Sequence, residues 1–275
     1  MLDKIDIPNV QKIGDNFLYN NEKLLEINLP NVKVIGNYCL FFNEVLKYIN
    51  IPKVEKIESS FLSYNEALEI LTIPNVKTIK DKFLANNAIL KEITIPNIEE
   101  IGNKFLFNNL ELKKIIIPQI KTIGASFLFY NTVLEEIKIP NVEIIKDYFL
   151  NKNKQLKQIE LPNVKEIGKC FLQNNEILES INLLFIKIIE DNFLTLNKNL
   201  KAINIPNAKT IGNNFLYLNN TLKKIDLPKV LEVGDFFLFF NEVLIEINMP
   251  NVVSIGRNYL SNNNLITKPT ISQRK

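Results

Sequence analysis

Residues 96–117 read PNIEEIGNKFLFNNLELKKIII, and the same pattern starts again at Pro118. Prolines recur every 22 residues, at 8, 30, 52, 74, 96, 118, 140, 162, 206, 228 and 250. Leu184 fills the one interval of 44, so aligning the chain on this column, position 0, gives twelve copies. A single copy is too short to bury its own apolar residues. We therefore expect the copies to stack as coils around one continuous core.

Several columns of the repeat hardly vary. Position 10 is Leu and position 13 is Asn in all twelve copies, and position 9 is Phe except at Cys39 and Tyr259. The closing I-x-[IL] alternates with period two, which predicts a strand with one buried face. Position 6 holds every glycine of the chain and predicts a turn that favours positive φ. Four copies place Glu58, Lys80, Lys146 and Glu190 there instead.

The invariant asparagine is predicted to face inward. Its amide can both donate to and accept from backbone groups that a tight bend would otherwise bury without partners. The alternative is an exposed asparagine ladder that binds a ligand. An unpaired buried amide costs roughly 1–3 kcal/mol, which favours the structural interpretation.

The repeat resembles a known family. The stretch L-x-x-I-x-[IL], as in Leu90–Ile95, resembles the strand half of a leucine-rich repeat, and I-G-x-x-F-L-x-x-N resembles the second half of BspA-like repeats. Phe-Leu stands where that subfamily usually has Ala-Phe, and Asn where it has Cys. The resemblance implies a right-handed leucine-rich-repeat solenoid with a parallel β-sheet on the concave face and short strands or 3₁₀ turns on the convex side. It also implies binding of other molecules, often with display on a cell surface.

The repeats predict one domain. A single solenoid of twelve repeats is expected over 1–266, followed by a polar, basic tail over 267–275. No capping segment is evident at either end, which suggests a fragment of a longer protein or end-to-end self-association. The first residues read as repeat rather than signal peptide, and no apolar run is long enough to span a membrane. The compartment stays open between cytoplasm and, for a fragment, a bacterial cell surface.

Composition argues against catalysis. The chain has 275 residues and no histidine, which excludes Ser-His-Asp and Cys-His catalysis and His-ligated metal. Its acidic residues are dispersed, its glycines form no phosphate loop, and Cys39 replaces a core Phe and is expected to be buried. The net charge of +3 is too small to imply a nucleic-acid partner, and the outward columns mix both signs of charge, so they form no basic stripe. We therefore expect a non-enzymatic protein with no cofactor, no metal and no nucleic-acid partner.

Binding information should lie in the columns where the copies differ. The outward positions of the main strand would line the concave face, and a solvated sheet face is the alternative. The candidate partner-binding residues there are Tyr48, Ile70, Glu92, Lys114, Ile116, Glu136 and Lys138.

A second candidate surface is an aromatic ridge at positions 11 and 12. Exposed contiguous aromatics often mark interaction surfaces, whereas packing of the rings within the turns is the alternative. The ridge residues are Phe41, Phe42, Tyr64, Phe129, Tyr130, Phe239 and Phe240. A third feature is the coil that starts at Leu184 and carries Phe185 and Glu190, because it lacks both proline and glycine. Either a bend or a local apolar patch would account for it.

These observations favour a non-enzymatic binding module that presents an extended repeat surface to a protein, or to a glycan. The alternative is a structural spacer or stalk segment of a larger surface or adhesin-like protein.

Overall fold

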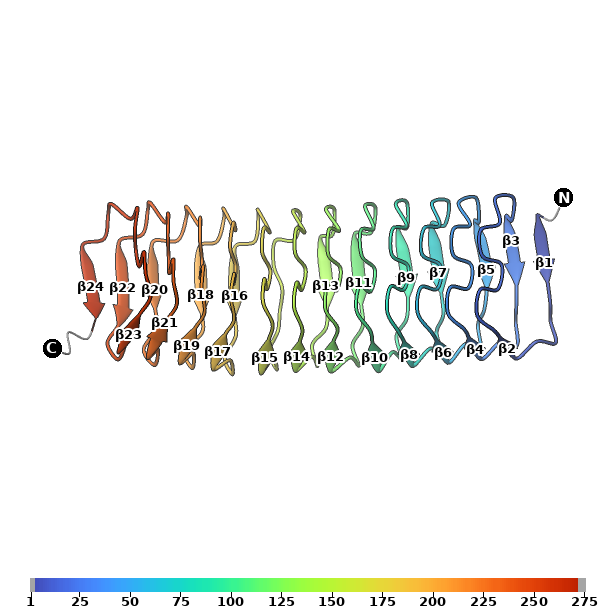
Figure 1. Ribbon diagram of the computed structural model, residues 1–275, viewed down its shortest axis with the longest axis horizontal. Helices are drawn as coiled ribbons and strands as arrows, with labels where there is room; N and C mark the ends of the chain where they lie inside the picture. The colour runs from blue at the N-terminus through green and yellow to red at the C-terminus, as the bar shows by residue number, and fades with distance from the viewer. Residues whose placement is uncertain (1–2, 272–275) are drawn as a thin grey trace. The chain divides into compact units, whose positions relative to one another are not determined.

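The computed structural model describes residues 3–271. The chain divides into two compact units, Met1–Ile139 and Pro140–Lys275. Each unit is a parallel β-solenoid, and no helix occurs among the described residues. With the exception of residues 158–160, the coils contribute a long strand at positions 18–20 and a short, two-residue strand at positions 4–5, with turns between them (Figure 1).

The described residues of the first unit form thirteen strands. The long ones are β1 (Lys4–Asp6), β3 (Glu26–Asn28), β5 (Tyr48–Asn50), β7 (Ile70–Thr72), β9 (Glu92–Thr94), β11 (Lys114–Ile116) and β13 (Glu136–Lys138). The short ones are β2 (Lys12–Ile13), β4 (Val34–Ile35), β6 (Lys56–Ile57), β8 (Thr78–Ile79), β10 (Glu100–Ile101) and β12 (Thr122–Ile123). All pairs are parallel with partners 22 residues apart, as in Ile5↔Ile27 and Ile13↔Ile35.

The second unit repeats this plan. Its short strands are β14 (Ile144–Ile145), β15 (Glu166–Ile167), β17 (Ile188–Ile189), β19 (Thr210–Ile211), β21 (Glu232–Val233) and β23 (Ser254–Ile255). Its long strands are β16 (Ser180–Asn182), β18 (Ala202–Asn204), β20 (Lys224–Asp226), β22 (Glu246–Met249) and β24 (Lys268–Ile271). Residues 158–160 occupy a long-strand position without forming a strand.

The sheet extends into the predicted tail. The backbone of β24 pairs with β22 in the same 22-residue register, so Lys268–Ile271 continue the solenoid. Pro269 stands where earlier coils have Ile, and an edge strand tolerates this because it needs no donor on its open side. Residues 272–275 of the predicted tail lie outside the described residues.

The inward columns form the core of each unit. The Leu at position 10 is fully buried in most coils, and the Phe at position 9 stacks on its equivalent in the next coil. Phe83, Phe105 and Phe127 form such a stack in the first unit, with ring centroids 5.3 and 5.6 Å apart. In the second unit the stack runs from Phe149 to Phe237, with successive centroids 5.2–5.5 Å apart. Offset stacks of this kind add stability beyond the burial of their area.

The turns do not use glycine for positive φ, so that prediction is wrong. No glycine has positive φ, whereas the residues at positions 8, 10 and 12 do in every coil, as at Lys104, Leu106 and Asn108 with φ of 55°, 51° and 56°. This alternation turns successive backbone N–H groups toward opposite neighbours. Lys104 and Asn108 donate to the following coil, whereas Leu106 donates to Phe83 of the preceding one. The coil-to-coil hydrogen bonds and the burial of the Leu side chain stabilise a conformation that costs roughly 1–2 kcal/mol per residue.

Eight of the twelve copies have glycine at position 6, and its place there has a different reason. A Cβ on Gly36 would lie 2.7 Å from the carbonyl carbon of Gly14 and 2.8 Å from the backbone nitrogen of Asp15. Both atoms belong to the preceding coil, so glycine here permits two backbones to approach closely. The column is explained by the spacing between coils and not by the turn.

The prediction that the invariant asparagine faces inward and donates to the backbone is confirmed, whereas the predicted acceptance is not met at Asn43, Asn65 and Asn109, whose amide oxygens have no hydrogen-bond partner among the described residues. Asn43, Asn65, Asn87, Asn109 and Asn131 are completely buried in the first unit. Each donates from Nδ2 to the carbonyl oxygen of the position 10 Leu in the preceding coil, at 2.8–2.9 Å. The ladder therefore closes the bend of each coil against its neighbour.

Candidate interaction surface

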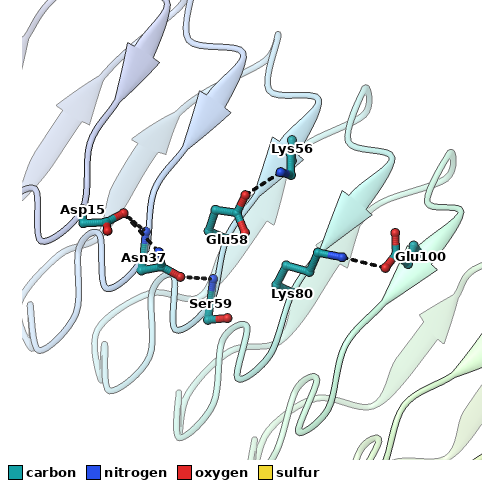
Figure 2. Close-up of polar contacts among 7 residues, drawn as sticks. All are labelled: Asp15, Asn37, Lys56, Glu58, Ser59, Lys80 and Glu100. Carbon is teal, nitrogen blue, oxygen red and sulfur yellow. Dashed lines mark hydrogen bonds and ion pairs between the residues drawn. The ribbon is translucent and has the colours of Figure 1, made fainter.

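Polar side chains near position 7 join consecutive coils. Asp15 Oδ1 accepts from the backbone N–H of Asn37 at 2.8 Å, and Asn37 Oδ1 accepts from that of Ser59 at 3.2 Å, as Figure 2 shows. The same arrangement recurs at Asn103 with Asp81 and at Asp235 with Asn213. We did not predict this ladder from the sequence, although the abundance of Asp and Asn in the column was a visible sign of it.

Two of the residues that replace glycine form ion pairs. Glu58 lies 2.6 Å from Lys56 Nζ, and Lys80 Nζ lies 2.7 Å from Glu100 (Figure 2). The hydrogen bond and the charge of Glu100 raise the pKa of Lys80. These partly exposed pairs contribute little stability individually, and Lys80 stays charged at neutral pH.

Both cysteines are buried and free. Burial raises the pKa of the Cys39 thiol to about 11, and its Sγ donates to the carbonyl oxygen of Gly14 at 3.0 Å. A thiol with a raised pKa is a poor nucleophile at neutral pH. Within residues 3–271, no group of three or more Cys, Asp and Glu side chains is placed to hold a metal ion.

The long-strand face of the first unit, formed by the outward residues of the odd-numbered strands β1 to β13, carries the predicted partner-binding residues. Tyr48 is 67% exposed and Ile70 is 56% exposed, in the same column of consecutive coils. They line a shallow depression of about 800 Å³ over β5 and β7, two strands that are not hydrogen-bonded to each other. Asn50 and Thr72 add an amide and a hydroxyl to its lining.

Charged groups surround this depression. Lys47 and Glu69 belong to its lining, Glu69 lies 2.8 Å from Lys91 Nζ, and Glu26 lies 3.0 Å from Lys4 Nζ. An apolar centre with a charged rim is the usual anatomy of a protein-binding patch.

The other predicted residues of this face lie apart from the depression. Glu136 lies 2.7 Å from both Lys114 and Lys138, and these two lysines lower its pKa. Ile116 is exposed beside them, and Glu92 is exposed on β9. The structure therefore brings Tyr48 and Ile70 together and places the charged residues in a separate ion-pair cluster.

An amide ladder on the same face went unnoticed in the sequence. Asn28 donates to Asp6 at 2.9 Å, and Asn50 donates to Asn28 at 2.7 Å. Strands in register align identical columns, so recurrence of Asn and Asp at position 20 was the available sign.

The aromatic ridge consists of half-buried stacks rather than one continuous surface. In the first unit, Phe41 packs on Tyr19 and Phe42, at 5.3 and 4.7 Å between centroids, and Phe42 stacks on Tyr64 at 4.7 Å. Phe129 stacks on Phe107 at 5.2 Å, and Tyr130 beside it is exposed. In the second unit, Phe239 and Phe240 pack edge to face at 4.6 Å. Most of these rings cover one another, which is the geometry expected of packing within the turns.

A sequence profile described as the BspA type leucine rich repeat region, six copies, matches residues 1–110, 77–197, 121–235 and 153–267. The chain belongs to this family. Its departures from the usual BspA type pattern, Phe-Leu at positions 9–10 and Asn at position 13, occupy the buried columns described above. A search among curated proteins finds no match.

Solved structures show the same fold. A leucine-rich repeat protein from Bacteroides ovatus superposes with a TM-score of 0.58 at 21% identity, over 97% of this chain and 78% of that one. A leucine rich cell surface protein from Faecalibacterium prausnitzii gives 0.57 at 20% identity, over 100% and 80%. The pneumococcal vaccine antigen PcpA gives 0.54 at 17% identity, over 94% and 78%.

The predicted fold class is thus confirmed as a leucine-rich-repeat solenoid with short strands opposite the long-strand sheet. The BspA type repeat is a fold that suggests a binding or surface-protein module and protein interaction. In residues 3–271 there is no helix with the length and hydrophobicity that a membrane span requires.

Proposed function

We propose that this BspA type protein is a non-enzymatic binding module that docks a protein partner on the long-strand face of its first unit. The observation that carries the proposal is the exposure of Tyr48 and Ile70 side by side in one depression. Neither side chain belongs to the core, because Ile49 and Leu71 are the residues of these two strands that point inward. Exposed aromatic and aliphatic groups at the centre of a charged rim are the typical anchors of protein interfaces.

The charged residues of the face would then set orientation rather than affinity. Glu136 with Lys114 and Lys138 forms a solvent-exposed cluster, where pairing with a partner's charges changes the association rate more than the affinity. Ile116 and Glu92 would lie toward the edge of such an interface.

The test starts with a photo-crosslinking residue in place of Tyr48. Proteins that it captures are purified, and their affinity is measured for the wild-type chain and for a Tyr48→Ser/Ile70→Ser variant by titration calorimetry. We expect the variant to bind at least about tenfold more weakly, because anchor residues carry most of the binding free energy. Lys12→Ser, on the short strand β2, serves as the matched surface control.

An unchanged affinity in the Tyr48→Ser/Ile70→Ser variant would move the interface away from this depression. A glycan array probed with the same two proteins examines the glycan alternative, which the amides of Asn28 and Asn50 favour. A structural spacer or stalk is the second candidate function, favoured by coil-to-coil ladders that make each unit continuous. It predicts neither a crosslinked partner nor glycan binding.

A further inference from the structure

The coil that begins at Leu184 interrupts a hydrogen-bond ladder of the second unit. At position 1, Asn163 donates from Nδ2 to the carbonyl oxygen of Pro140 at 2.9 Å, and Asn207 and Asn251 make the same bond at 2.7 Å. Phe185 occupies this position in the Leu184 coil and cannot donate. Its ring is instead 52% exposed.

The hydrogen bonding of the short-strand sheet is interrupted between the Leu184 coil and the coil before it. Strands β15 and β17 are not hydrogen-bonded, although β14–β15 and β17–β19 are. A depression of about 610 Å³ lies between them, lined by Lys165, Glu166, Ile167, Phe185, Lys187, Ile188 and Glu190. Ile188 is 58% exposed, so the depression presents two apolar side chains to solvent, Phe185 and Ile188.

A comparable gap in the first unit lacks the apolar side chains. Strands β10 and β12 are also not hydrogen-bonded, and Gln119 stands at position 1 of that coil. The depression there is lined by Lys77, Asn97, Glu99, Gln119 and Lys121. Opening of the sheet therefore does not by itself require exposed apolar residues, and the pair Phe185 and Ile188 needs its own explanation.

Charge at position 3 changes at this coil as well. In the first unit the column alternates, so that Lys33 lies 3.6 Å from Glu55 and Lys77 lies 3.4 Å from Glu99. In the second unit Lys165 lies 2.6 Å from Glu143, but the next two residues of the column are Lys187 and Lys209.

These two lysines are neighbours without a counter-charge. The backbone N–H of Lys209 donates to the carbonyl oxygen of Lys187 at 2.8 Å, so the two side chains extend from neighbouring, hydrogen-bonded segments. No carboxylate within residues 3–271 lies within 4.0 Å of either ammonium group. Like charges on directly opposed residues are destabilising, which argues that the folded unit alone gives no reason for this arrangement.

We propose that the Leu184 coil is a second docking site, which binds an acidic, extended peptide segment of a partner protein. Lys187 and Lys209 pair with carboxylates of the segment, and Phe185 and Ile188 cover an apolar side chain beside them. Charge-assisted hydrogen bonds to the two ammonium groups would relieve their mutual repulsion. Glu166 and Glu190 also line the depression and repel carboxylates, so the acidic residues of the segment must be held by Lys187 and by Lys209 of the next coil.

The site is independent of the long-strand face of the first unit, so either proposal can fail alone. The probe is a fluorescein-labelled peptide in which glutamate and leucine alternate, and binding is followed by fluorescence anisotropy. We expect saturable binding that weakens at higher salt concentration, because exposed charges are screened. A Lys187→Glu/Lys209→Glu variant should bind about tenfold or more weakly, and Phe185→Asn, which restores the residue of the neighbouring coils, should weaken binding without changing its salt dependence.

The matched control is Lys198→Glu/Lys223→Glu, two exposed lysines of the same unit outside the depression, which should bind the peptide like the wild type. Circular dichroism melting curves of all variants establish that each is folded. The proposal is overturned if the wild-type chain does not bind the peptide or if the control loses as much affinity as Lys187→Glu/Lys209→Glu. It is also overturned if a glutamate–glycine peptide, heparin or single-stranded DNA binds as tightly, since the apolar side chains would then have no part.

Discussion

The side chain of Asn109 joins two consecutive coils by donating from Nδ2 to the backbone oxygen of Leu84 at 2.9 Å. The same coil is tied to the following one, because the backbone N–H of Asn109 donates to Oδ1 of Asn131 at 3.2 Å. Both bonds are fully shielded from water. A buried hydrogen bond of this kind contributes modestly when made but is costly when one partner is removed.

Asn109→Leu should therefore destabilise the protein by about 1–3 kcal/mol, because the Leu84 carbonyl would stay buried without a donor. Asn97→Leu is the control, since Asn97 donates to Pro74 at 2.8 Å but is exposed, so water can replace it. Urea unfolding followed by circular dichroism measures both. Equal losses from the two variants would contradict the special role of the buried ladder.

Gly36→Ala should destabilise the fold although Gly36 has an ordinary negative φ. The new Cβ would lie 2.6–2.8 Å from Asp15 Oδ1, Gly14 C and Asp15 N, and the two backbone atoms cannot move without shifting the coil. We expect a loss of about 1–3 kcal/mol, as for overpacked cores. In Gly14→Ala the Cβ has no heavy atom within 4 Å, so stability should stay or rise by about 0.4–1 kcal/mol. Similar unfolding midpoints for the two variants would refute the close-approach explanation.

The glycine column shows where sequence reasoning stops. The 22-residue period, the inward columns and the buried asparagine could be predicted, because a repeat places identical residues at identical depths. The spacing between neighbouring coils could not, since it depends on backbone atoms that are far apart in the sequence. The positive φ of Leu106 could not be predicted for the same reason. Leucine rarely adopts that conformation, and only the hydrogen bonds to adjacent coils impose it.

The candidate site was predictable in part. Variation among copies pointed to Tyr48 and Ile70, but it gave no reason to separate them from Lys114, Glu136 and Lys138. That separation follows from the shape of the surface, since the lining of the depression includes Tyr48 and Ile70 and none of these three charged residues. The sequence likewise gave no sign that β15 and β17 would not be hydrogen-bonded to each other. It did show that the Leu184 coil differs from the others, because this coil lacks the proline and the glycine.

Cys39 should react slowly with thiol reagents in the folded protein. Its pKa is raised to about 11, so at pH 8 the thiolate fraction falls about a hundredfold below that of a free cysteine, and the rate should rise as pH approaches 11. Absorbance after addition of Ellman's reagent to a Cys170→Ser variant isolates this thiol. Labelling of the native protein as fast as in urea would show that Cys39 is not held in the core.

Phe41→Ala should reduce stability by about 2 kcal/mol, less than the roughly 3–5 kcal/mol expected for a fully buried ring such as Phe105. Phe41 is half-buried and packs against Tyr19, Phe42 and Tyr64 with centroids 4.7–5.4 Å apart. Its loss would leave those three rings exposed to water on one face, which makes the aromatic ridge part of the packing of the turns. Urea unfolding of Phe41→Ala and Phe105→Ala measures the two effects. An unchanged midpoint for Phe41→Ala would instead mean that these rings are free to meet a partner, and the ridge would then be a stronger docking candidate than the depression at Tyr48.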